Sequence, residues 1–174
     1  MDKKAEGLLQ IAFAVAIAAA AILFSEDISG LGAYGYAGVF LIAALASATI
    51  FFPAPGWAAV VALSGTLDPV LLGVFAGLGS AIGEHTGYIA GDGIRDILSQ
   101  RIKETKQVEG FVKRYGVGAI FLFAFIPNPL FDIAGLVSGG LKIAWWRFLL
   151  ACAGGRVLRY ILLAMIGAFT LSLV

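Results

Sequence analysis

The sequence contains few charged residues, a single cysteine and a single histidine. Only 13% of its 174 residues are charged and 60% are hydrophobic, and the mean hydropathy is +0.96. Soluble globular domains have about 25% charged residues, so this composition excludes an ordinary water-soluble domain. The net charge of +1 gives no indication of a nucleic-acid partner. We therefore expect an integral membrane protein without a nucleic-acid partner.

Thiol and imidazole side chains are too few for common catalytic and metal sites. Cys152 can form neither an intrachain disulfide nor a multi-thiolate site, and its apolar surroundings predict a buried packing residue. His85 has no second histidine with which to share a metal ion. We therefore expect no metal, no cofactor and no enzymatic activity.

Polar linkers are also lacking, which favours one membrane domain over residues 1–174. A helix needs roughly 20 apolar residues to cross the hydrocarbon layer of about 30 Å. Full spans are predicted at 8–24, 69–91 and 144–172. A secretory signal peptide is the alternative for the first of these, but its end lacks small residues for cleavage, which favours an uncleaved span.

Prolines interrupt the first long apolar stretch, residues 28–67, which contains no charge. Pro53 and Pro55 predict a break because each removes a backbone donor and clashes with the preceding helical turn. The twelve residues between Pro55 and Asp68 make a helix of only about 18 Å, which is too short to cross. Asp68 and Pro69 predict the start of a new helix. The stretch therefore reads as a re-entrant hairpin.

The same arrangement recurs in residues 115–141, where two short apolar arms flank a proline pair. Residues 51–65 align with residues 125–139 at a constant offset of 74 (51 to 125), and both segments share Phe-x-Pro-x-Pro, an aromatic and a closing Ser-Gly. The predicted hairpin tips are Pro53, Pro55, Pro127, Asn128 and Pro129. Because one span separates the hairpins, they should enter from opposite faces, as in transporters with inverted repeats. The expected fold is an all-α membrane protein with about three full spans and two inverted re-entrant hairpins.

Basic residues are concentrated in residues 92–114, which predicts that this segment and the N-terminus are cytoplasmic. The C-terminus would then lie outside the cell membrane. Apolar residues in the same segment approximate helical spacing, which predicts an amphipathic helix on the inner surface with its charges facing solvent.

Ionisable residues inside apolar spans are costly, so each one is a candidate for function. Glu84 and His85 lie in the second span, Asp132 in the second hairpin, and Arg156 and Arg159 about one turn apart in the last span. We expect these residues to converge on a substrate or ion pathway. A structural ion pair is the alternative for the charged residues, and a packing role is the alternative for His85.

Glycines at 79, 83, 87 and 91 form an i, i+4 stripe on the second span. Small residues at this spacing let another helix approach closely. The stripe therefore predicts helix packing, not ligand binding.

Three segments together are similar to a known family: Pro53-Ala-Pro-Gly-Trp, residues 77–93 (GLGSAIGEHTGYIAGDG) and residues 116–140 (GVGAIFLFAFIPNPLFDIAGLVSGG). They resemble the DedA family, also called the VTT or SNARE-associated Golgi protein family, over about residues 30–170. The resemblance implies two oppositely inserted re-entrant hairpins. It also implies movement of lipids between leaflets, including polyprenyl-phosphate carriers and phospholipids.

Glu84 matches the acidic residue of the family's Gly-Glu motif. The family's Arg-Phe-x-Pro-x-x-Arg pattern is not kept, because Ala124 and Leu130 stand where its arginines are expected. The candidates to replace that charge are Asp132, Arg156 and Arg159.

The resemblance and the buried charges together predict a transporter that flips or scrambles a lipid or lipid phosphate, with proton exchange at Glu84 or Asp132. The expected partners are membrane lipids, such as polyprenyl phosphate or phospholipid, and a homo-oligomer remains open. The alternative is a secondary transporter of an ion or small solute on the same inverted-repeat scaffold.

Overall fold

The computed structural model describes residues 33–48, 56–93, 103–127 and 130–173. All regular secondary structure in these residues is helical. The helices are α3 (Ala33–Ala48), α4 (Gly56–Leu63), α5 (Pro69–Gly93), α7 (Lys103–Tyr115), α8 (Val117–Phe125), α9 (Phe131–Gly140) and α10 (Trp145–Leu171). The predicted first span at 8–24 and four of the five predicted hairpin-tip residues, Pro53, Pro55, Asn128 and Pro129, lie outside the described residues.

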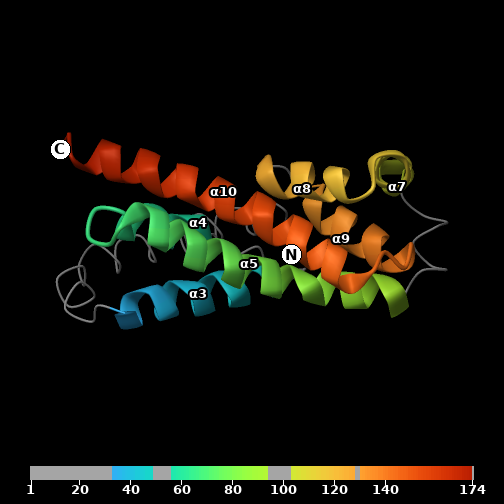
Figure 1. The fold of residues 1–174 in the computed structure, drawn as a ribbon, viewed down its shortest axis with the longest axis horizontal. Coiled ribbons are helices and arrows are strands. Elements are labelled where there is room, and N and C mark those ends of the chain that lie inside the picture. The colour runs from blue at the N-terminus through green and yellow to red at the C-terminus, as the bar shows by residue number, and fades with distance from the viewer. Residues whose placement is uncertain (1–32, 49–55, 94–102, 128–129, 174) are drawn as a thin grey trace, which may run out of the picture.

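Helices α5 and α10 are the two longest helices of the described part, and they pack against each other in opposite directions (Figure 1). Glycines on α5 make this contact possible. A Cβ atom at Gly73 would collide with the backbone of Ile161, and one at Gly77 would collide with the backbone of Val157. The two backbones therefore touch where no side chain could fit between them.

Two helical hairpins flank this central pair and enter from its opposite ends (Figure 1). In the first hairpin, α3 runs towards the middle of the molecule and α4 runs back. In the second, α8 runs inward from the other end and α9 runs back. The first arm of each hairpin packs on the long helix that follows it, α3 on α5 and α8 on α10. The second arm packs mainly on the long helix of the other half, α4 on α10 and α9 on α5.

Glycines at related positions make corresponding contacts with the first arms. Gly79 of α5 faces the backbone of Phe40 in α3, and Gly155 of α10 faces the backbone of Phe121 in α8. These two glycines are 76 residues apart (79 to 155). Each long helix thus approaches the first arm of its own hairpin through a glycine at the same place.

The second arms repeat the pattern at the same offset. Gly91 of α5 faces the backbone of Leu136 in α9, and Gly167 of α10 faces Val61 and the Ser64 hydroxyl in α4. These glycines are again 76 residues apart (91 to 167). The two halves therefore share one packing scheme, at an offset two residues longer than the offset of 74 between the proline segments.

Local chemistry explains where two of the helices begin and end. The Asp68 carboxylate accepts a hydrogen bond from the Leu71 amide at 2.8 Å, so the predicted N-cap of α5 is confirmed. Helix α8 ends at Phe125 because Ile126 is extended, with φ −77° and ψ 128°. Ile126 precedes Pro127, and the proline ring disfavours a helical conformation at the residue before it.

The helices differ in whether they are long enough to cross a bilayer. Among the described helices, α10 has both the length and the apolar composition of a membrane span. Its 27 residues extend about 40 Å, compared with about 30 Å of hydrocarbon. Large apolar side chains are exposed along it, including Leu150, Leu158, Leu162, Ile166 and Phe169. Helix α5 has 25 residues but is less apolar, since it contains Glu84, His85 and Asp92.

Helix α7 is amphipathic and packs its apolar face on the second hairpin. Val108 and Val112 are buried in a cluster with Ala134 and Val137 of α9. Its charged side chains at 106, 113 and 114 are exposed. The helix therefore has the two faces that the spacing predicted.

Close glycine packing generates a stability prediction with an internal control. Gly79→Ala should lower the free energy of unfolding by about 1–3 kcal/mol, because the new methyl group would overlap the Phe40 carbonyl. Gly87→Ala, on the same helix, places its Cβ in open space and should stabilise by about 0.5–1 kcal/mol through helix propensity. Gly87 thus departs from the predicted packing stripe. Melting curves of both variants in detergent would test this, and equal melting temperatures would contradict it.

Candidate functional site

A buried ion pair joins the two long helices near the middle of the molecule. The Arg156 guanidinium of α10 donates a hydrogen bond from Nη2 to Oε1 of Glu84 in α5. Each residue is only 7% exposed. The guanidinium carbon also lies 4.5 Å from the ring centroid of Phe131, the first residue of α9. Arg156 therefore connects α5, α9 and α10 through one side chain.

The surroundings of this pair are apolar. Ala81, Ala124, Phe131 and Cys152 form a buried cluster contributed by α5, α8, α9 and α10. A charge in such a cluster loses its hydration, so removing one partner leaves the other uncompensated. The Arg156 Nε atom is itself buried without a hydrogen-bond partner among the described residues. Among the described residues, the hydrogen-bonding groups of the pair are therefore only partly satisfied.

Arg159 and Asp132 lie beside the Glu84–Arg156 pair, but among the described residues neither forms an ion pair with it. Arg159 is half-buried one turn beyond Arg156, and its Nε is buried with no hydrogen-bond partner in the described part of the chain. Asp132 is exposed and follows Phe131 at the start of α9. Both charges act electrostatically on Glu84. The four charges from the second span, second hairpin and last span thus gather in one region, with Glu84 and Arg156 paired.

His85 makes contacts of a different kind. Its ring stacks on Tyr88 at a centroid distance of 5.2 Å and lies 6.2 Å from Trp145 and 6.3 Å from Phe148. The Tyr88 hydroxyl in turn donates to the Ile143 carbonyl at 2.5 Å. These contacts correspond to the packing alternative for His85. Its Nδ1 is buried without a hydrogen-bond partner among the described residues.

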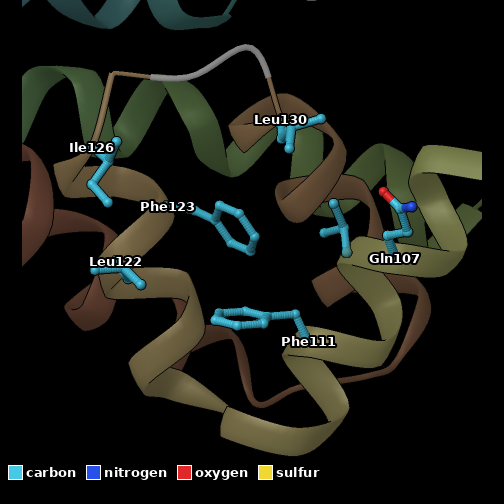
Figure 2. Close-up of a pocket in the computed structure, with 7 residues that line it drawn as sticks. Gln107, Phe111, Leu122, Phe123, Ile126 and Leu130 are labelled. Atoms are coloured by element: carbon cyan, nitrogen blue, oxygen red, sulfur yellow. The ribbon is translucent and has the colours of Figure 1, made fainter.

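An apolar pocket of about 360 Å³ lies between α7, α8 and the start of α9. Figure 2 shows the rings of Phe111 and Phe123 facing its interior. It is lined by Gln107, Val108, Phe111, Leu122, Phe123, Ile126 and Leu130. The charged residues do not line this pocket. Sequence reasoning missed it, because helical spacing marked the apolar face of α7 without showing the gap beside it.

Phe131 is the other participant that the sequence did not single out. Its only signal in the sequence was that it is an aromatic residue aligned with Trp57 in the repeat.

Within the described residues, no three His, Cys, Asp or Glu side chains gather as a metal site would need.

Comparison with known proteins identifies the family. The model of the VTT domain matches residues 52–169, more than half of the chain. The chain belongs to the VTT domain family. The match runs from before α4 almost to the end of α10 and includes all four clustered charges. This VTT domain protein is therefore a membrane protein.

Relatives of the VTT domain protein carry vacuole membrane names. It is 27% identical to vacuole membrane protein KMS2 of Arabidopsis thaliana over 126 residues, which are 62% of this chain and 30% of that protein. It is 39% identical to a vacuole membrane protein 1 homolog of Dictyostelium discoideum over 51 residues, which are 29% of this chain and 12% of that protein. The chain thus spans less than a third of the length of these relatives. No solved structure matches it significantly.

The buried ion pair of the VTT domain generates a double-mutant prediction. Arg156→Gln and Glu84→Gln should each destabilise by about 3–5 kcal/mol, because each leaves a buried charge without its partner. The double variant should recover much of that loss. Arg159→Gln is the matched control on α10, since Arg159 has no ion-pair partner among the described residues. Thermal melts in detergent measure all four, and strictly additive losses in the double variant would show that the two side chains are not coupled.

Proposed function

We propose that this VTT domain protein moves a lipid or lipid phosphate between the leaflets of the membrane, acting as a transporter and not as an enzyme. The observation that carries the proposal is a group of charges placed between two oppositely directed hairpins. Charges at such a depth are expensive and mark pathways for polar groups. A lipid headgroup is the polar group that must cross the apolar layer during this movement.

The lengths of the hairpin arms support a re-entrant layout. Helices α8 and α9 have 9 and 10 residues, which corresponds to about 15 Å each, or half of the hydrocarbon layer. They enter from the end opposite to α3 and α4 (Figure 1). We infer that both hairpins turn near the midplane of the bilayer. From opposite sides, they would shorten the hydrocarbon distance that a headgroup must cross. Inverted repeats with broken helices are a known basis for alternating access.

The arginines suit a phosphate headgroup. A guanidinium presents several donors in a planar fork that matches phosphate oxygens. Arg156 is paired with Glu84, whereas the buried Nε atoms of Arg156 and Arg159 have no hydrogen-bond partner among the residues described. We propose that a phosphate recruits these free donors, and that Glu84 or Asp132 exchanges a proton as the pair rearranges.

The positions of the basic residues indicate which side of the membrane each segment faces. We propose that α7 lies on the cytoplasmic side, with the α4–α5 turn and the C-terminus on the outside of the cell membrane. Cysteines at exposed Thr66 and Lys113, in a Cys152→Ala background, should then react with a membrane-impermeant maleimide from opposite sides. Labelling of both from one side of intact cells would overturn the inverted layout.

Transport itself can be measured in proteoliposomes with fluorescent short-chain lipids and polyprenyl phosphate, with and without a pH gradient. Arg159→Gln should reduce the flux of anionic lipid about tenfold or more, because a hydrogen bond to a charged group contributes about 1.5–3 kcal/mol. Arg147→Gln is the control, since Arg147 is exposed on the same helix and stacks on Trp146 at 5.0 Å.

Unchanged flux in both Arg159→Gln and Glu84→Gln would eliminate the role assigned to the charges. Wild-type protein that moves no lipid but carries ions or small solutes would instead favour the alternative secondary transporter.

A further inference from the structure

The apolar pocket beside α7 is built like a site for a hydrocarbon chain. Its volume of about 360 Å³ falls within the range of ligand sites, about 300–1,000 Å³. Its walls are aromatic and aliphatic, and Gln107 is its one polar lining residue (Figure 2). Leu122 and Ile126 remain 40% and 45% exposed on the α8 side. The pocket is therefore open on the α8 side and offers apolar walls to a hydrocarbon ligand.

The Arg114 guanidinium packs against a row of contacting aromatic rings that begins in the pocket. Phe111 and Phe123, which both line the pocket, contact each other edge to face at a centroid distance of 5.4 Å. Phe111 also contacts Tyr115 at 4.6 Å, and the Arg114 guanidinium lies over the Tyr115 ring at 5.3 Å. Arg114 is exposed, so its charge is available beside the apolar walls.

The positions along α7 show that this charge belongs to the pocket face. Gln107, Phe111 and Arg114 follow the i, i+4, i+7 spacing of one helical face. Lys113 points elsewhere and forms an ion pair with Glu109 at 2.6 Å. Among the basic residues of α7 whose side chains the structure describes, Lys106, Lys113 and Arg114, it is Arg114 that shares a face with the pocket.

We propose that this pocket binds one hydrocarbon chain of a membrane lipid whose anionic phosphate headgroup pairs with Arg114. The apolar walls supply affinity in proportion to the chain length that they cover, and the guanidinium selects a negative headgroup. The proposal goes beyond lipid transport, because a lipid can bind here whether or not the protein moves it between leaflets. It also separates this site from the Glu84–Arg156 region, whose residues do not line the pocket.

The test uses the full chain in detergent and a photoactivatable dodecyl phosphate with a diazirine near its chain end. Labelling should concentrate on peptides that contain Phe111 and Phe123. A trimethylammonium probe with the same chain should label these peptides several-fold less. Unlabelled alkyl phosphates should compete about fourfold better for each added methylene until the pocket is filled.

Variants of the pocket wall provide matched controls. Leu122→Trp should occupy part of the space and lower labelling about fifteenfold, which corresponds to lost contact with about two methylenes. Leu162→Trp, at an equally accessible leucine of α10 that is 43% exposed, should leave labelling unchanged. If Leu122→Trp does not fold, Gln107→Trp fills the pocket from the opposite wall and should have the same effect.

Variants of α7 test the headgroup. Arg114→Gln should reduce labelling by the phosphate probe and leave the trimethylammonium probe unchanged, while Lys113→Gln should affect neither. Labelling spread over the exposed residues of α10, or equal labelling of wild type by both probes, would overturn the proposal. Because these measurements report binding alone, a failed transport assay would not change their outcome.

Discussion

The close approach of α5 and α10 is the constraint on which the other contacts depend. Gly73 and Gly77 let the two backbones touch, and this brings Glu84 of one helix within reach of Arg156 of the other. A larger residue at either glycine would force the two backbones apart. Van der Waals contact between backbones thus positions the electrostatic centre of the molecule.

Much of the helical arrangement could be predicted from the sequence because its signals are local. Asp68 and Pro69 mark the start of a helix wherever they occur after a turn, and Pro127 ends the preceding helix at Phe125 for steric reasons. Charge-free stretches likewise reveal apolar helices without any knowledge of their neighbours. These elements follow from rules that act over a few residues.

The candidate site was less predictable because its contacts join residues that are distant in the chain. The sequence indicated which charges were buried, but either Glu84 or Asp132 could have been the partner of Arg156. In the folded protein, Arg156 pairs with Glu84, which is 72 residues away from it in the chain. Asp132 is exposed at the start of α9. The placement of Phe131 beneath the guanidinium also required the relative positions of α9 and α10. The pocket beside α7 is a property of three helices together and has no motif of its own.

The exchanged packing of the hairpins has a consequence for how the chain is made. Helix α4 packs mainly on α10, yet α10 is synthesised about eighty residues later. Until that helix leaves the ribosome, the buried face of α4 lacks its main partner. The first half therefore cannot complete its packing until α10 has been synthesised. Contacts of such long sequence separation also slow folding. Insertion machinery that shields α4 in this interval would protect the chain from misassembly, whereas truncation before α10 would leave both halves without a stable core.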